Sequence, residues 1–183
     1  MRRDTKKRLL TLIIAGAIGA APAAAVPTPV AQSAKAFART ICATISREAQ
    51  QRALPENFFA RLIWKESRFD PNAVSPKGAQ GIMMLTPETA ELMSIENPMD
   101  AGQSIAGGSK YLWRMKRRIA KLSPDIPDQD LTWMALAGYN MGLGHLLDAR
   151  QVTRDRGGNP DRWVDVKDAL PLLMERRWYS QAR

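Results

Sequence analysis

One carboxylate in this chain stands where an ionised group is costly. Glu66 follows Phe59, Leu62 and Ile63 at intervals that place all four side chains on one helix face. Burial among apolar neighbours disfavours the charged form and raises the pKa of a carboxyl group. A carboxyl that keeps its proton near neutral pH can serve as a general acid. Structural ion pairing, for example with Arg68, is the alternative that this spacing leaves open.

The elements that must position Glu66 are helices and one loop. We expect a helix at about 35–51 and a second from Pro55 to the Asp70–Pro71 pair, where proline disfavours continuation. The following "DPNAVSPKGAQG" is rich in Pro, Gly, Asn and Ser and predicts an extended loop. "TPETAELM" predicts a short helix with Thr86 as its N-cap and Pro87 at its first position.

Two further helical stretches complete the expected fold. Residues 102–122 carry Ile105, Leu112 and Ile119 at heptad spacing, and Gly107 and Gly108 between them favour close helix packing. Another helix is expected from about Asp130, and its tail 142–150 is expected to continue as a further helix. Alternating strand patterns are scarce, so we predict an all-α, single-domain protein.

The amino-acid composition is that of a soluble globular protein. The chain has 183 residues with 45% hydrophobic and 25% charged residues, as soluble globular proteins do. Residues 1–25 combine a basic start, a short apolar run and small residues, which is typical of a cleaved secretory signal peptide; an uncleaved membrane anchor is the alternative. We predict a linker at 26–33, the folded domain at 34–183, and a periplasmic location.

The net charge and the counts of cysteine and histidine limit the kinds of partner and cofactor that the chain is expected to bind. The formal net charge is +9, and five Lys or Arg with one acidic residue fall within 1–25, so the remainder carries +5. This charge favours an anionic surface such as a cell-wall polymer, and an ordinary solvated surface is the alternative. No nucleic-acid motif accompanies the charge. With one cysteine and one histidine, neither an internal disulfide framework nor a Cys/His metal site is expected, nor any cofactor. The apolar context of Cys42 favours its burial.

The string from Glu66 to Ala90, "ESRFDPNAVSPKGAQGIMMLTPETA", resembles the signature of the goose-type-lysozyme-like (SLT) lytic transglycosylases over 25 consecutive positions. Further segments, in the same order along the chain, are most similar to the catalytic domain of membrane-bound lytic transglycosylase F. They are "SIAGG" followed by "YL", then "ALAGYNMG", "HLLDAR", "NPDRWVDVK" and "LPLL". This resemblance covers about Pro55 to Tyr179. It implies a lysozyme-like all-α fold with a glycan-binding groove.

The resemblance implies that Glu66 cleaves the β-1,4 bond between N-acetylmuramic acid and N-acetylglucosamine in peptidoglycan. Glu66 would first donate a proton and then accept one as a 1,6-anhydro ring closes on the muramyl residue. Most glycosidases use two carboxyl groups. Here no second carboxylate has a matched apolar setting, and Asp70 is expected to be a helix-end or turn residue.

The remaining matched positions are expected to bind the substrate. Ser75 matches a loop hydroxyl that bonds to Glu66 or the sugar, with a turn cap as the alternative. Besides Gly81, the other positions are Met83 and Met84, one of which is expected to be a core residue, and the pair Tyr139 and Asn140. His145 is expected to be structural.

Two departures from the family pattern leave alternatives open. About 30 residues between the leader and Pro55 cannot hold the solute-binding-protein-like domain of F-type enzymes, and the sequence ends at "ERRWYSQAR", before a segment that carries a further active-site Tyr. A weakly active or non-catalytic peptidoglycan-binding module, or a hydrolytic muramidase, is therefore the alternative to the lytic enzyme. We expect a monomer that acts on glycan strands, with a secretion or conjugation apparatus as a partner for a specialised role.

Overall fold

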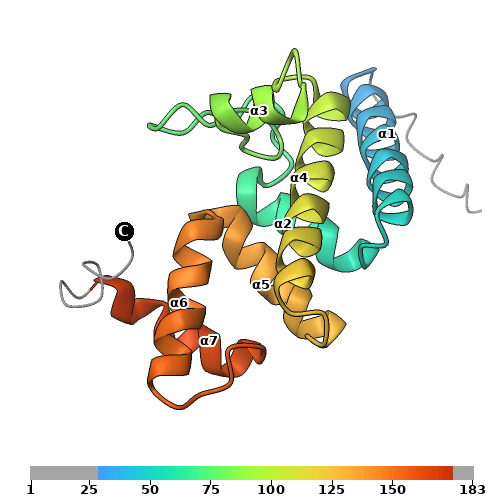
Figure 1. Ribbon diagram of the computed structural model, residues 1–183. Helices are drawn as coiled ribbons and strands as arrows, with labels where there is room; N and C mark the ends of the chain where they lie inside the picture. The colour runs from blue at the N-terminus through green and yellow to red at the C-terminus, as the bar shows by residue number, and fades with distance from the viewer. Residues whose placement is uncertain (1–28, 175–183) are drawn as a thin grey trace, which may run out of the picture.

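The computed structural model describes residues 29–174, with side chains from 33 to 173, and this part of the chain is helical (Figure 1). Its strand-like pairs are isolated bridges, Val74 with Gln80 and Gln80 with Leu85. The prediction of an all-α fold is confirmed. The helices are α1 (Pro29–Gln51), α2 (Glu56–Ser67), α3 (Pro87–Met93), α4 (Ala101–Leu122), α5 (Asp128–Met141), α6 (Leu143–Asp155), α7 (Trp163–Ala169) and the 3-10 helix η1 (Pro171–Met174).

Helix α4 is the central element, and α1, α3 and α5 pack against it (Figure 1). Its heptad residues Ile105, Leu112 and Ile119 have no exposed surface, as their spacing predicts. Asp100 caps its N-terminus by accepting a hydrogen bond from the Gln103 N–H at 2.7 Å. The core therefore surrounds α4, and the elements that carry the expected site residues are positioned by their contacts with it.

Two glycines in the second turn of α4, Gly107 and Gly108, let other segments approach its backbone. A Cβ at Gly108 would lie 2.4 Å from the Met83 side chain, and one at Gly107 would lie 2.6 Å from Ile95. Such distances are shorter than van der Waals contact, so side chains there would separate the loop from the helix. The prediction of close packing at both glycines is confirmed.

The boundaries differ from the expected ones at two places. Helix α1 begins at Pro29, so residues 29–33 of the expected linker are helical; proline is tolerated in a first helical turn because its missing N–H would have no partner there. Residues 1–28, including the expected leader, lie outside the described residues. Helix α2 ends at Ser67, three residues before Asp70, since Arg68 adopts a left-handed conformation.

The expected burial of Cys42 is wrong. Cys42 is exposed, because on α1 the core contacts are made by Ile41 and Ile45 while the neighbouring positions face outward. Within residues 29–174 no helix has both the length and the apolarity needed to cross a bilayer.

Candidate active site

The end of helix α2 fixes the position of Glu66. After Ser67 the chain leaves the helix through Arg68 and Phe69, whose φ angles are 57° and 65°. Left-handed conformations are strained for residues with a side chain and persist where surrounding contacts hold them. The Phe69 ring packs against the core and lies 5.9 Å from the Trp64 ring, centroid to centroid. Glu66 is therefore held in the last turn of a helix that ends abruptly.

Glu66 is half-buried, and burial raises the pKa of its carboxyl group. Its neighbourhood includes Tyr139 of α5, because the charge of Glu66 contributes to raising the pKa of the Tyr139 hydroxyl, after the larger effect of burial. No described ion pair involves Glu66, so the alternative of pairing with Arg68 has no support in the structure. The environment favours a protonated carboxyl and a neutral tyrosine.

Three hydroxyl groups from three helices bind the backbone of the loop beside Glu66. Ser67 of α2 donates to the carbonyl of Ile82 at 2.8 Å, and Tyr139 of α5 donates to the carbonyl of Met83 at 2.9 Å. Ser104 of α4 accepts from the Met83 N–H at 3.3 Å. Hydrogen bonds to buried backbone groups are costly to lose. These three hydrogen bonds fix the loop to the helices around it, including the helix that carries Glu66.

The conformation of the loop requires glycine at position 81. Gly81 has φ 77°, and a Cβ there would lie 1.8 Å from the carbonyl oxygen of Pro98. Its N–H donates to the Ala73 carbonyl at 2.9 Å, which closes the loop on itself. The expected substrate-binding position at Gly81 is thus first of all a backbone position that admits no side chain.

The two methionines of the loop have different surroundings. The Met83 side chain has no exposed surface and packs on Gly108, so core packing, which was expected for one of the pair, describes Met83. The side chain of Met83 is therefore not placed to line a substrate surface. Met84 is half-buried with φ 48°, and it is the methionine that has surface available.

The other expected residues are partly engaged by local contacts. The Ser75 hydroxyl accepts from the Ala79 N–H at 3.0 Å, which is the turn-cap alternative. Asn140 is exposed, and its side-chain amide donates to the Leu136 carbonyl one turn back along α5. Asp70 is exposed and accepts from the Asn72 N–H at 2.9 Å, so it is the turn residue that its place before proline predicts. His145 is exposed on α6.

Sequence reasoning missed two residues that organise this region. Tyr111 of α4 lies against Tyr139 with ring centroids 5.4 Å apart, and it also interacts with the Thr89 hydroxyl of α3. Ser104 is fully buried and holds the loop at Met83. The signal for Ser104 was a polar residue on the apolar face of a predicted helix, since buried hydroxyls need a partner.

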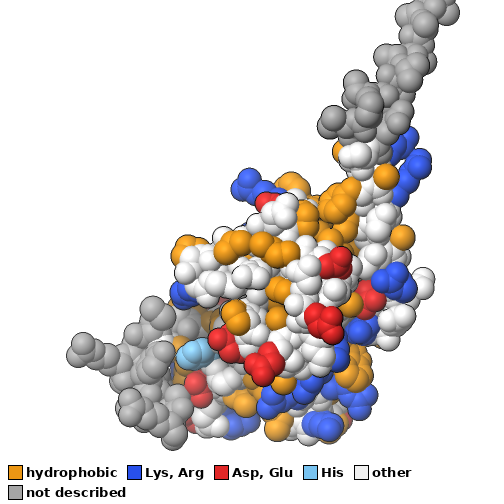
Figure 2. Space-filling model, turned by 90° about the horizontal axis from the view of Figure 1, so that it is seen from above, with side chains coloured by type: hydrophobic (Ala, Val, Ile, Leu, Met, Phe, Trp, Pro, Cys, Tyr) orange, Lys and Arg blue, Asp and Glu red, His pale blue; other side chains and the backbone are white. Residues whose placement is uncertain are grey.

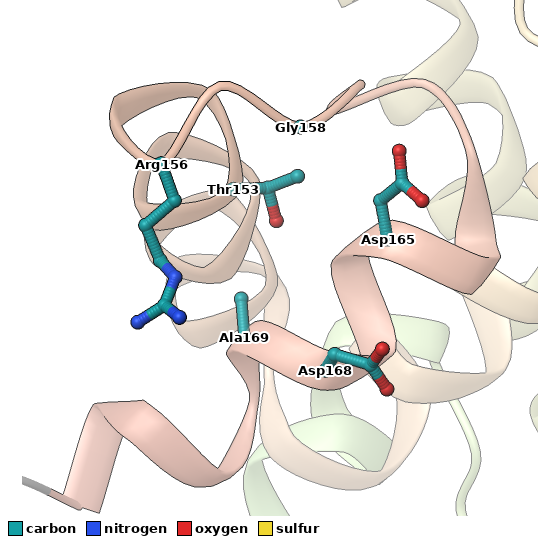
Figure 3. Close-up of a pocket in the computed structure, with 6 residues that line it drawn as sticks. All are labelled: Thr153, Arg156, Gly158, Asp165, Asp168 and Ala169. Carbon is teal, nitrogen blue, oxygen red and sulfur yellow. The ribbon is translucent and has the colours of Figure 1, made fainter.

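A pocket elsewhere in the molecule has no expected site residue in its lining (Figure 3). It lies between α6 and α7, with Asp165 and Asp168 on one side and Arg156 turned away from both. Asp165 accepts the Asn159 N–H at 2.9 Å, so one of its carboxylate oxygens serves the local turn. Among residues 33–173, no three His, Cys, Asp or Glu side chains gather as a metal site would require.

Comparison with known families decides the relationship. The family model described as "Transglycosylase SLT domain" matches residues 43–161, which include α2, the loop, α4 and α5. This chain belongs to the Transglycosylase SLT domain family. Its all-α, lysozyme-like fold class follows, and the family resemblance read from the Glu66–Ala90 string is confirmed.

Individual members of the SLT family are similar over the same region. A protein of Actinobacillus pleuropneumoniae serotype 5b (strain L20), named membrane-bound lytic murein transglycosylase F, is 54% identical over 121 residues, which are 66% of this chain and 24% of the relative. Proteins of the same name from Marinobacter nauticus (74% of this chain, 26% of the relative) and Haemophilus influenzae (strain PittEE; 74% and 28%) are each 47% identical over 136 residues. The chain thus spans about a quarter of the length of these relatives.

Proposed function

We propose that this chain is a peptidoglycan lytic transglycosylase whose single acid and base is Glu66. The observation that carries the proposal is a half-buried carboxyl with a raised pKa, at the end of a helix whose last turn is bonded to the loop of the family signature. The relatives' name, lytic murein transglycosylase, supports the same reaction and substrate.

The proposed reaction needs one carboxyl group in two protonation states. Protonated Glu66 donates to the glycosidic oxygen, the bond from muramyl C1 to that oxygen breaks, and the N-acetylglucosamine side leaves as an alcohol. The resulting carboxylate then accepts the proton of the muramyl C6 hydroxyl as its oxygen bonds to C1. The 1,6-anhydro ring closes without water, and Glu66 ends protonated. Burial of Glu66 serves the first step, because it favours the protonated form.

Tyr139 and the loop hold this carboxyl in place. The Tyr139 hydroxyl donates a hydrogen bond to the Met83 carbonyl, and its raised pKa keeps the hydroxyl neutral while Glu66 changes charge. An arrangement that does not reorganise during the reaction lowers the barrier, because correct positioning is a large part of catalysis. Tyr139 therefore acts in this proposal by positioning and by contact with the sugar.

The substrate is proposed to lie across the loop and the end of α5. Met84 and Asn140 present exposed or half-exposed surface, while Gly81 and the turn at Ser75 set the path of the backbone. A backbone that presents no side chain at Gly81 lets a sugar approach closely. Met83 would contribute through its backbone alone, since its side chain is buried.

We propose that the chain acts in the cell envelope, in the periplasm, as a monomer. Its relatives are named membrane-bound and act on murein by name, and the first 25 residues are typical of a secretory leader. Opening the wall for a secretion or conjugation apparatus is a role that a domain of this size would suit.

The first experiment is mass spectrometry of muropeptides released from purified peptidoglycan by the wild-type chain and by Glu66→Gln. We expect products that end in 1,6-anhydromuramic acid from the wild type, and a release rate lower by about 10²-fold or more in the variant, because that is the usual contribution of a general acid. Asp70→Asn is the matched control. It removes a carboxylate four residues away and should leave release within a few-fold.

The other outcomes separate the alternatives. Reducing ends in place of anhydro ends would mean hydrolysis by a muramidase. Retained binding to peptidoglycan without any product would mean a binding module. Equal loss of activity in Asp70→Asn would mean a pair of carboxyl groups, and unchanged activity in Glu66→Gln would remove Glu66 from its role.

A further inference from the structure

Helix α4 carries a concentrated positive charge on the side that faces away from the core. Residues 110–121 include six Lys or Arg and no acidic residue. With 3.6 residues per turn, five of the six lie opposite Ile105, Leu112 and Ile119, which are fully buried. The basic face of α4 is defined here as these five residues: Lys110, Arg114, Arg117, Arg118 and Lys121.

The sixth basic residue of this stretch points toward the core and forms an ion pair. Lys116 is buried and donates to Asp128 at 2.8 Å. By contrast, none of the five residues of the basic face forms an ion pair within residues 33–173. Figure 2 looks down on the molecule of Figure 1 and shows Lys and Arg side chains gathered at its lower edge, the side on which α4 crosses in front.

Like charges three and four residues apart on a helix repel one another. The helix dipole offsets this for Lys121 in the last turn, but its effect fades within one turn and does not reach Lys110 or Arg114. The Lys110 ammonium donates to the Met93 carbonyl at 3.1 Å, so it has a partner within the chain. The uncompensated row therefore runs from Arg114 to Lys121, about 10 Å along the helix, and anions outside the chain would balance its charge.

Apolar side chains border the basic face. Trp113 is 36% exposed with the Arg117 guanidinium 5.0 Å above its ring, and Leu122 is 57% exposed at the end of the helix. Shallow pockets lie beside Trp113, lined by Arg52 and Lys110 on one side and by Arg117 and Ala120 on the other. Basic residues with an exposed Trp and Leu on one helix are the composition of a membrane-surface helix.

We propose that the basic face of α4 binds the surface of an anionic phospholipid bilayer. Lys and Arg side chains only donate hydrogen bonds, and lipid phosphate oxygens only accept them. The carboxylates of peptidoglycan stem peptides also accept hydrogen bonds, but a wall polymer has no apolar layer to receive the exposed Trp113 and Leu122 side chains. Trp113 and Leu122 then enter the headgroup region beside the basic row, and the domain lies with α4 along the membrane.

The experiment measures binding of the full chain to vesicles of phosphatidylglycerol and phosphatidylcholine by co-sedimentation over a range of lipid concentrations. The test variant is Arg114→Gln, Arg118→Gln and Lys121→Gln, since none of these side chains makes a described hydrogen bond or ion pair. The matched control, Arg154→Gln, Arg156→Gln and Lys167→Gln, removes the same charge from the α6–α7 end. Any affinity of the apolar leader is shared by all three proteins, so differences in half-saturating lipid concentration remain measurable.

We expect the test variant to need at least about tenfold more anionic lipid for half-saturation, because each Lys or Arg near such a surface contributes a several-fold factor. The control should shift by less than about threefold, and 0.5 M salt should abolish the difference between the proteins. Equal shifts in both variants, or none, would overturn the proposal. Unchanged lipid binding with weaker retention on purified peptidoglycan would assign the face to the wall polymer instead.

This proposal does not depend on the proposed catalytic activity. Glu66→Gln should bind anionic vesicles as the wild type does, and the α4 test variant should release soluble muropeptides at the wild-type rate. Failure of one proposal therefore leaves the other intact.

Discussion

At the scale of the residue, Glu66 combines access to solvent with a raised pKa. It retains partial access to solvent, yet burial is sufficient to raise the pKa of its carboxyl group. A fully buried carboxyl could not reach a polymer, and a fully exposed one would ionise near its ordinary pKa. Asp70, four residues further along, is exposed, and its carboxylate caps a turn.

The raised pKa of Glu66 predicts a pH-dependent stability difference between the wild type and Glu66→Gln. Folding favours the protonated carboxyl, so the wild type has its full stability below the unfolded pKa of about 4.3 and loses part of it as pH rises through the folded pKa. Glutamine does not ionise and keeps its stability. The melting temperature of the variant relative to the wild type should therefore rise as the pH increases from the unfolded pKa through the raised folded pKa, and then level off.

Thermal unfolding followed by circular dichroism at intervals of half a pH unit measures this difference. Asp70→Asn, at an exposed position, provides the comparison for removing a charge nearby. A difference between Glu66→Gln and wild type that stays constant over the whole pH range would show that the substitution acts through packing and not through ionisation.

At the scale of the element, the loop between α2 and α3 is held by the helices around it. Its bridges at Gln80 are isolated, so the loop has no sheet to stabilise it. Side-chain hydroxyls of α2, α4 and α5 bond to the backbone at Ile82 and Met83 instead. Because the same helix α2 carries Glu66, the positions of acid and loop are coupled.

Two glycines of this loop allow the effect of backbone strain on stability to be measured separately from the effect of steric overlap. Gly78 and Gly81 both have positive φ, at 81° and 77°, but a Cβ at Gly78 would meet nothing within 4 Å, whereas one at Gly81 would meet Pro98. We expect Gly78→Ala to lower the free energy of unfolding by about 1 kcal/mol, from backbone strain alone. Gly81→Ala should lower it by about 2–4 kcal/mol, since overpacking adds to the strain.

Chemical denaturation in urea gives both free energies. Gly81→Ala should also reduce muropeptide release at temperatures where the protein remains folded, because the loop must move away from Pro98. If the two substitutions lowered the free energy of unfolding equally, the close approach of Pro98 to Gly81 would make no contribution to stability.

At the scale of the whole molecule, α6, α7 and η1 form the C-terminal part of the described fold, and Arg150 of α6 joins it to the end of α4. The Arg150 guanidinium is buried and donates to the Ser123 hydroxyl after α4, to the Pro160 carbonyl and to Asp161. One side chain thus links the end of α4 to the loop that precedes α7. Buried charged groups of this kind are costly to disturb.

We expect Arg150→Met to lower the free energy of unfolding by about 2–3 kcal/mol, slightly below the usual range for breaking a buried pair because Asp161 keeps some solvent. Arg154→Met on the same helix is the control. Arg154 is exposed and bonds only to the Gln151 side chain among the described residues, so its loss should change stability by less than about 0.5 kcal/mol. Similar values for the two variants in urea denaturation would contradict this role of Arg150.

Helical periodicity determined most of the fold in advance. It predicted the buried faces of α2 and α4, because side-chain burial follows the helical repeat. Residue type predicted the Thr86 cap and the close packing at the two glycines of α4. The family signature likewise pointed to Glu66 and Tyr139 before any contact was known. These features depend on residues close together in the sequence or on a contiguous string.

Tertiary contacts decided what local spacing could not. Met83 is in the core while Met84 has surface, Cys42 is exposed, and Ser104 and Tyr111 acquire their places only when distant helices pack together. Two neighbouring loop residues have no periodicity that distinguishes inside from outside, and a buried hydroxyl is defined by a partner far away in the chain. The sequence by itself therefore determined which helices form and which carboxyl is unusual, whereas the packing of α2, α4 and α5 around one loop decided how that carboxyl is held.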